Sequence, residues 1–135
     1  MNKNGPILIV EDDIDDQYMF AKVFVQLEYK NEIIFFSEGE KILEYLNNNK
    51  VEPFLIFSDI AMPKLNGMEL REKLQESDDL RIRSIPYLFF TTGAPKKDIT
   101  DAYSKSIQGF FIKPMTFSAL EEKLKVIIDY WQNSV

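Results

Sequence analysis

The sequence predicts an α/β protein, a doubly wound (βα)5 sandwich around a five-stranded parallel sheet. Five short apolar runs recur along the chain, and helical patterns lie between them. The runs are continuous rather than alternating, which is typical of strands covered on both faces. Strands that alternate with helices through right-handed crossovers give this architecture. The runs are Ile7–Val10, Ile33–Phe36, Phe54–Phe57, Tyr87–Phe90 and Gly109–Ile112.

Helices are indicated where apolar residues recur on one face of a helical turn. Two such stripes are Phe20, Val23, Phe24 and Leu27, and Leu120, Leu124, Ile127, Ile128 and Trp131. Ser37–Glu40 has the form of a capping box, and Thr116 is expected to cap the last helix. The arrangement is flavodoxin-like, with expected strand order 2-1-3-4-5. We expect the five units to fill residues 6–132 as one domain, with no output domain, and Glu76–Pro86 to be a solvated loop.

Composition narrows the class of protein and the kind of metal site. The chain has 135 residues, 45% apolar and 28% charged, as in a soluble globular domain. Its net charge of −6 argues against direct nucleic-acid binding. Without cysteine or histidine, any metal must be held by oxygen, which favours magnesium, calcium or manganese. No apolar stretch reaches membrane-spanning length, so we expect a cytoplasmic protein with no membrane partner.

Polar residues follow four of the apolar runs at the point where each strand is expected to end. Asp59 comes one residue after the third run, beyond Ser58, and the first, fourth and fifth runs lead into Glu11-Asp12-Asp13, Thr91-Thr92-Gly93 and Lys113-Pro114. Open parallel sheets gather ligands and catalytic groups at this edge. The four sets of residues are therefore expected to converge on one site.

The acids at this edge predict a magnesium site. Adjacent carboxylates repel each other and are costly to desolvate, and a divalent cation would resolve both conflicts. Glu11, Asp12, Asp59 and the backbone carbonyl of Ala61 offer the oxygen ligands that Mg²⁺ prefers. Asp13, Asp15 and Asp16 are instead expected to complement the dipole of the first helix.

Asp59 is the predicted nucleophile of the site. A carboxylate can attack a phosphoryl group and form an acyl phosphate. Lys113 offers a positive charge to the phosphoryl oxygens, and the Thr92 hydroxyl offers a hydrogen-bond donor. The strand ends together therefore indicate an aspartyl-phosphate chemistry.

Five motifs lie at these strand ends: Ile-Val-Glu-Asp-Asp at 9–13, Asp-Ile-Ala-Met-Pro at 59–63, Asn-Gly at 66–67, Thr-Thr-Gly-Ala at 91–94 and Phe-Ile-Lys-Pro at 111–114. Over nearly its whole length, the chain resembles the response regulator receiver domains of two-component signalling. The resemblance implies that Asp59 accepts phosphate from a histidine kinase and that Glu11 and Asp12 are the magnesium-binding acids. It also implies that Thr92 and Lys113 are the switch hydroxyl and the invariant lysine, with a cis peptide bond before Pro114.

The resemblance further implies a switch. Thr92 would move toward the phosphoryl group, and Phe110, where many relatives carry tyrosine, would turn inward. The readout surface would comprise the helix after Thr92, the fifth strand and the last helix, through which such domains bind targets or dimerise. Ile99, Tyr103 and Phe117 are expected to contribute to it. A histidine phosphotransfer protein and a downstream target protein are the other expected partners.

Alternatives are a phosphorylation-independent binding scaffold, an aspartyl-phosphate hydrolase and a flavin-binding protein. A hydrolase of this kind would need a second acid two residues after the nucleophile, and this chain has Ala61 there. The flavin reading would need a phosphate loop where this chain has acids. Ala61 and Ala94 also stand where relatives often carry polar residues that affect dephosphorylation, so we expect a partner to set the phosphoryl lifetime.

Overall fold

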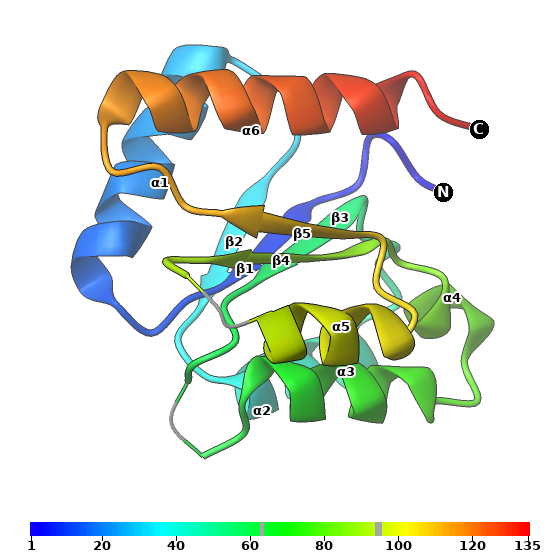
Figure 1. Cartoon of the computed structure of the whole chain (residues 1–135). Helices are drawn as coiled ribbons and strands as arrows, with labels where there is room; N and C mark the ends of the chain where they lie inside the picture. Colours follow the sequence, from blue (N-terminus) through cyan, green and yellow to red (C-terminus); the bar gives the residue numbers. More distant parts are fainter. Residues whose placement is uncertain (63, 94–95) are drawn as a thin grey trace.

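Five strands form one parallel sheet in the computed structural model, which describes residues 1–62, 64–93 and 96–135 (Figure 1). The strand order is β2-β1-β3-β4-β5, which confirms the predicted fold class. Neighbouring strands are in register, with Val10 paired to Ser58 and Phe89 paired to Phe110. The strands are β1 (Ile7–Val10), β2 (Ile33–Phe36), β3 (Leu55–Ser58), β4 (Tyr87–Thr91) and β5 (Gly109–Ile112).

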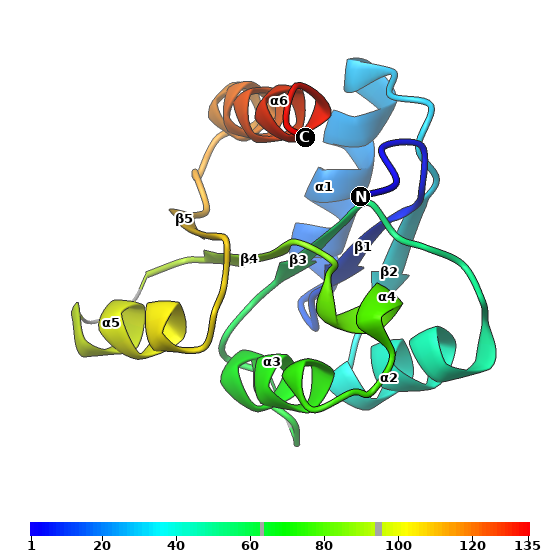
Figure 2. The ribbon, with the colours of Figure 1, turned by 90° about the vertical axis from the view of Figure 1, so that its right-hand side faces the viewer.

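Helices cover both faces of the sheet, as Figure 2 shows, with α1 and α6 on one face and α2, α3 and α5 on the other. Both chain ends lie at the side of the sheet opposite the carboxyl ends of the strands (Figure 1). In the described part of the chain, no helix is long and apolar enough to cross a membrane. The helices are α1 (Ile14–Leu27), α2 (Gly39–Asn48), α3 (Gly67–Gln75), α4 (Leu80–Arg83), α5 (Lys96–Ser104) and α6 (Phe117–Gln132).

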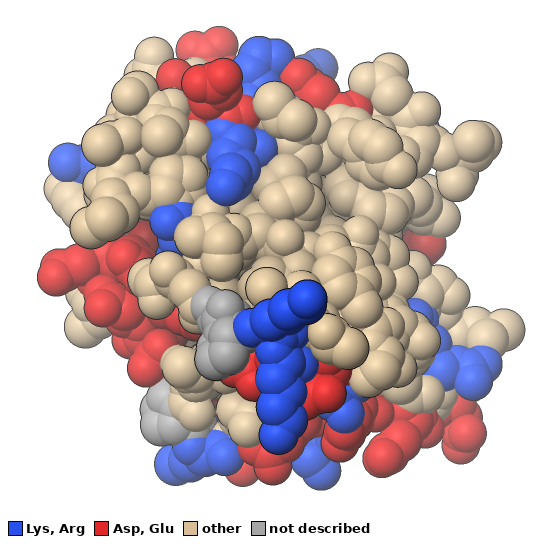
Figure 3. Space-filling model, viewed as in Figure 1, with Lys and Arg blue, Asp and Glu red and all other residues tan. Residues whose placement is uncertain are grey.

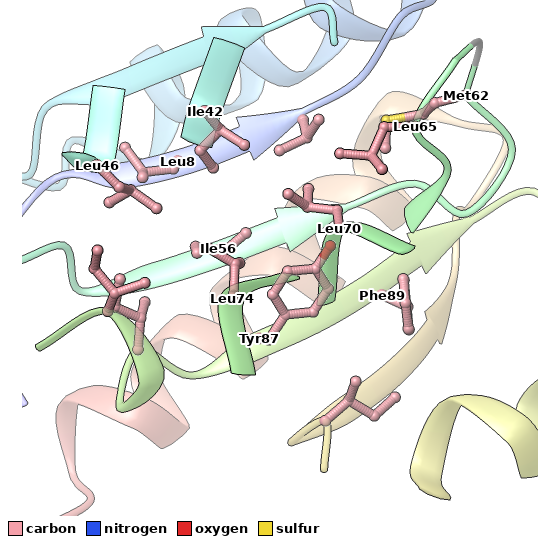
Figure 4. Close-up of a cluster of buried hydrophobic side chains, with 14 of the residues drawn as sticks. Leu8, Ile42, Leu46, Ile56, Met62, Leu65, Leu70, Leu74, Tyr87 and Phe89 are labelled. Carbon is pink, nitrogen blue, oxygen red and sulfur yellow. The ribbon is translucent and has the colours of Figure 1, made fainter. Parts of the chain in front are cut away.

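The core has two parts, one on each face of the sheet, because successive strand residues point to opposite faces. Ile7 and Ile9 of β1 pack with Phe20 and Leu124 under α1 and α6. Leu8 faces the other way, into the cluster drawn in Figure 4 with residues of α2 and α3. The predicted helix stripes are confirmed, since Phe20, Val23, Phe24, Leu120, Leu124, Ile127 and Ile128 are buried.

Helix α4 was not predicted, and the expectation of a solvated loop from Glu76 to Pro86 is wrong for this segment. Ile82 is buried in the core, and the Asp79 carboxylate caps the short helix by accepting from the Arg81 amide at 2.9 Å. Arg81 also donates to the backbone oxygens of Leu46 and Val51. Ile82, the equally buried Ile85 and Arg81 therefore hold the segment against α2 and the loop that follows it.

Of the two helix caps predicted from the sequence, the one at α6 is confirmed and the one at α2 is wrong. The Thr116 hydroxyl accepts from the Ala119 amide at 3.3 Å, which confirms it as the cap of α6. Helix α2 begins at Gly39 with Glu38 as N-cap and no side-chain cap hydrogen bond. The predicted capping box at Ser37–Glu40 is therefore wrong, because the helix starts one residue later than that motif requires.

Arg71 is a buried cation that fixes the start of β5. Its guanidinium lies over the Tyr87 ring, 5.3 Å from the centroid, and the residue is 2% exposed. It donates to the backbone oxygens of Lys105 (3.1 Å) and Ser106 (2.5 Å), in the turn between α5 and β5. Burial lowers the pKa of Arg71. Helix α3 is thus tied to the strand that ends at the functional edge.

Candidate functional site

The carboxyl ends of four strands meet at one edge of the sheet, at the left of Figure 1. Glu11, Asp59 and Lys113 each follow directly after the last residue of β1, β3 and β5. The Asp59 amide donates to the Val10 oxygen at 3.1 Å, and the Lys113 amide donates to the Thr91 oxygen at 2.7 Å. Backbone pairing therefore continues just past the strands and places these side chains together.

Three carboxylates at this edge form a site that suits a divalent cation. Glu11, Asp12 and Asp59 each offer an oxygen, and these oxygens lie within 4.8 Å of one another. Glu11 is buried, Asp12 is exposed and Asp59 is half-buried. An all-oxygen set with one solvent-facing member fits Mg²⁺ or Mn²⁺, which keep some of their waters. Acidic side chains gather at this edge of the surface in Figure 3.

Both oxygens of Asp59 have partners. Oδ1 accepts from the Ile60 amide at 2.7 Å and from the Ala61 amide at 3.4 Å. Oδ2 accepts from Lys113 Nζ at 3.1 Å. These donors fix the orientation of the carboxylate. Ala61 therefore lies beside Asp59 as expected, and a role for its carbonyl in metal binding stays a prediction.

Lys113 is the cation at the centre of the site. Its Nζ donates to Glu11 Oε1, to Asp16 Oδ2 at 3.0 Å and to Asp59 Oδ2 at 3.1 Å. Its side chain is 7% exposed. An ammonium group has three protons, so each carboxylate takes one of them. The lysine is thus shared among three acids from three different segments.

Burial and pairing act against each other in the pKa values of this cluster. Burial raises the pKa of Glu11 to about 7, although the hydrogen bond and charge of Lys113 act to lower it. For Lys113, burial lowers the pKa, but hydrogen bonds to Glu11 and Asp16 outweigh burial and the pKa is raised. Lys113 therefore stays charged, and Glu11 gains a proton more readily than an exposed glutamate does.

The two threonines at the end of β4 belong to different faces. Tyr87 and Phe89 point to the face of α3 and α5, so alternation along the strand places the Thr91 side chain there too. Phe110 packs on the same face, with its ring centroid 5.8 Å from that of Phe89. Thr91 is 3% exposed and shares this face with the predicted switch aromatic.

Thr92 lies on the opposite side. It is exposed, and it lines a cavity with Phe20 of α1, Leu120 of α6 and Lys113. The predicted neighbourhood of Thr92 and Lys113 is therefore present. The cavity that Thr92 lines lies on the side of α1 and α6, whereas Phe110 packs on the side of α3 and α5. The coupling of Thr92 to Phe110 stays a prediction.

A family model described as the response regulator receiver domain matches residues 7–125. The chain belongs to this family. The matched region is slightly shorter at its C-terminal end than the domain predicted over residues 6–132. The resemblance on the strand-end motifs is thereby confirmed, and the chain is a receiver domain with a phosphoacceptor role in two-component signalling.

Receiver domains of several functions are related to this chain in sequence. The probable methanogenesis regulatory protein FilR2 of Methanothrix harundinacea is 29% identical over 93% of this chain and 82% of its own length. The chemotaxis protein CheY1 of Helicobacter pylori is 28% identical, with 90% of this chain and 95% of that protein covered. These relatives share the receiver domain and differ in pathway.

Solved structures confirm the fold. The phosphorylated cyanobacterial phytochrome response regulator RcpA has a TM-score of 0.85 at 23% identity, covering 96% of this chain and 95% of that one. The Mn²⁺-bound form of the response regulator Rcp1 has a TM-score of 0.80 at 24% identity, with 96% and 95% covered. The latter protein carries a divalent metal.

The peptide bond before Pro114 is trans, so the predicted cis bond is wrong; none of the described residues has a cis bond. A bond before proline favours trans by about 0.5–1 kcal/mol, and in this receiver domain the trans form already brings Lys113 Nζ to three carboxylates. Ala94, named above for dephosphorylation, lies outside the described residues.

Asp16 and Thr91 both contact Lys113, and the sequence predicts neither contact. Asp16 was assigned to the helix dipole, but its carboxylate pairs with Lys113 across 97 positions of the chain. The resemblance names the neighbour of Thr91, Thr92, as the switch hydroxyl, and that role stays a prediction. The spacing of Thr91 from Phe89 carried the signal, because a two-residue period assigns both side chains to one face of the sheet.

Proposed function

We propose that Asp59 is the phosphoacceptor of this receiver domain and receives its phosphoryl group from a phosphohistidine of a histidine kinase in an Mg²⁺-dependent reaction. The observation that carries the proposal is the position of the Asp59 carboxylate. It lies 3.1 Å from the Lys113 ammonium and within the three-carboxylate cluster. A nucleophile placed between a fixed cation and a metal-sized oxygen cluster suits phosphoryl transfer.

The transfer forms one bond and breaks another. A carboxylate oxygen of Asp59 attacks phosphorus and forms an O–P bond. The P–N bond to the kinase histidine breaks, and its electron pair stays on the imidazole nitrogen. Lys113 Nζ, held at the acceptor, donates to the transferred phosphoryl oxygens. The receiver domain is modified once in each signalling event, so we propose no turnover activity of its own.

Glu11, Asp12, Asp59 and the Ala61 carbonyl would hold Mg²⁺ in this proposal. The bound ion supplies positive charge against the phosphoryl oxygens. Glu11 is the buried member of the cluster and Asp12 the exposed one, so water reaches the site from the Asp12 side. The Mn²⁺-bound form of the related Rcp1 supports a divalent ion in this receiver domain.

Intact-protein mass measured after incubation with Mg²⁺ and acetyl phosphate tests the acceptor. Wild type is expected to gain one phosphoryl group, Asp59→Asn is expected to gain none, and removing Mg²⁺ with a chelator is expected to stop the gain. Asp78→Asn, at an exposed aspartate of the α3–α4 connection, serves as the matched control and should be labelled like wild type. A label on Asp59→Asn, or none on wild type, would count against Asp59 as the acceptor.

The faces of the sheet support Thr91 as the hydroxyl that links the phosphoryl group to Phe110. Thr91, Phe89 and Phe110 share one face, so a movement of Thr91 opens or closes space next to the Phe110 ring. Thr92 shares its cavity with Lys113 and is proposed to contact the phosphoryl group without acting on Phe110.

Replacing each threonine by valine separates these roles, because valine keeps the shape and removes the hydroxyl. Thr91→Val is expected to abolish the phosphorylation-induced change in the aromatic NMR signals of Phe110, and Thr92→Val is expected to retain it. Phosphoryl incorporation, followed by mass in the same samples, shows that both proteins are labelled. The reverse pattern would return the switch role to Thr92.

The proposed readout surface comprises α5, β5 and α6. Ile99, the fourth residue of α5, is half-buried, whereas several large apolar side chains of this surface are exposed. Exposed apolar groups gathered on one surface mark a site of protein contact. We propose that a target protein or a second copy of the chain binds here, that a histidine kinase supplies the phosphate, and that a histidine phosphotransfer protein can receive it. The exposed residues are Tyr103, Ile112, Phe117, Val126 and Tyr130.

A further inference from the structure

Asp16 contacts the site through Lys113. Its Oδ2 accepts from Lys113 Nζ at 3.0 Å, as close as the 3.1 Å contact of Asp59 with the same atom. Asp16 belongs to the first turn of α1, whereas Glu11 and Asp59 follow strands. It is also outside the metal-sized cluster of Glu11, Asp12 and Asp59. Its link to the acceptor therefore runs through the lysine.

The three partners of Lys113 differ in their access to solvent. The side chains of Glu11 and Asp59 are 2% and 11% exposed, and that of Asp16 is 35% exposed. A partly exposed carboxylate is well solvated without its partner, whereas a buried one is not. When another anion competes for Lys113, the contact with Asp16 therefore costs least to give up.

We propose that Asp16 is a positioning residue that holds Lys113 in the resting state and competes with the aspartyl phosphate for its ammonium group. This inference rests on the proposed role of Asp59 as acceptor. All three protons of Lys113 are taken in the resting site, one of them by Asp59 itself, so a phosphoryl group on Asp59 can gain a second one only from Glu11 or Asp16. While Asp16 is paired with Lys113, less of the ammonium charge is available to stabilise phosphoryl transfer to Asp59.

Asp16→Asn removes the competing charge and keeps the size of the side chain. Phosphorylation by acetyl phosphate with Mg²⁺ is expected to become faster by up to about fivefold. This factor is the interaction free energy of a partly exposed ion pair, converted to a ratio of rates. Asp15→Asn is the matched control. Asp15 is the neighbouring acid in the same turn, and among the described residues its carboxylate has no ion pair or hydrogen bond. The Asp15→Asn substitution therefore removes one negative charge from the same turn and leaves the contacts of Lys113 unchanged.

A double-mutant cycle with Lys113→Gln shows whether Asp16 acts through the lysine. The effect of Asp16→Asn is expected to vanish in the Lys113→Gln background. A second readout needs no phosphoryl group: by NMR, the Lys113 ammonium protons should exchange with water several-fold faster in Asp16→Asn than in wild type. Thermal unfolding of each variant separates this effect from a loss of fold.

The phosphorylation rates of these variants can either support or overturn the proposed role of Asp16. Faster phosphorylation in Asp16→Asn alone, lost in the Lys113→Gln background, supports it. A rate equal to that of Asp15→Asn, a slower rate, or an effect that persists without Lys113 would overturn it. If wild type itself takes no label, the proposed function fails, and the exchange of the Lys113 protons still decides whether Asp16 holds the lysine.

Discussion

Gly67→Ala is expected to destabilise the domain and to slow phosphorylation together. A Cβ at position 67 would lie 2.2 Å from the Asp59 oxygen and 2.9 Å from the Ile60 Cα, and both neighbours are backbone. The Gly67 oxygen also accepts from the buried Tyr87 hydroxyl at 3.2 Å, so α3 cannot shift freely away from the loop. Overpacking of this kind costs about 1–3 kcal/mol or more. The Asp59 backbone must move, and its carboxylate moves with it.

Chemical denaturation and the rate of phosphoryl incorporation measure the two effects of Gly67→Ala. Gly93→Ala is the matched control, because no described atom lies within 4 Å of a Cβ placed there, apart from its chain neighbours. Its free energy of unfolding is expected to stay within about 1 kcal/mol of wild type. If Gly67→Ala leaves both the unfolding midpoint and the phosphorylation rate unchanged, the backbone at Asp59 and Ile60 can move away from the new Cβ without loss of stability, and the prediction is wrong.

Lys113→Met is expected to have a large effect on both stability and chemistry. Breaking a buried ion pair by removing one partner costs about 3–5 kcal/mol, because the remaining charges stay buried. Here Glu11 and Asp59 would remain without a cation, with side chains 2% and 11% exposed. Loss of one donor to the developing phosphoryl charge is expected to lower the phosphorylation rate by about 10²-fold or more.

The loss of stability in Lys113→Met should depend on pH and on metal. The pKa of Glu11, about 7 in the folded protein and raised by burial, lies above its ordinary value of 4.5 and rises further without Lys113. The folded state then binds the proton more tightly than the unfolded state, so stability falls as pH rises from about 4.5 through the folded pKa. In metal-free buffer the variant should unfold more easily at pH 8 than at pH 6.

Unfolding curves at the two pH values, with and without Mg²⁺, measure these effects of Lys113→Met. Added Mg²⁺ is expected to restore part of the stability at pH 8, since an ion that binds only the folded state stabilises it. Lys125→Met, at a lysine whose side chain is 61% exposed, controls for the loss of a surface charge. Equal stability of Lys113→Met and wild type without metal would contradict a central role of the lysine.

The sequence predicted the parts of the fold and site that depend on simple periodicity. Continuous apolar runs identified the five strands, and Asp59, Glu11 and Lys113 follow the observed strands directly. Because parallel strands end at the same edge of a sheet, their convergence followed from the fold alone. The family match and the sheet order confirm the fold and the phosphoacceptor role.

The parts that could not be predicted depend on single residues or on contacts across the chain. Helix α4 has only four residues, too few for a periodic pattern, and Ile82 alone anchors it in the core. The choice between Thr91 and Thr92 depends on which residue ends the strand, and strand ends are uncertain in sequence by more than one residue. The pairing of Asp16 with Lys113 joins two distant segments and leaves no local pattern.

The position of Trp131 determines what intrinsic fluorescence can report. It is the only tryptophan of the chain and packs against the core near the end of α6. Helix α6 begins four residues after Lys113, and from Phe117 to Trp131 it rises about 21 Å. The indole therefore lies far from the acceptor. Its emission should follow global unfolding and be nearly silent to metal or phosphate, so optical detection of either requires a fluorophore introduced near the strand ends.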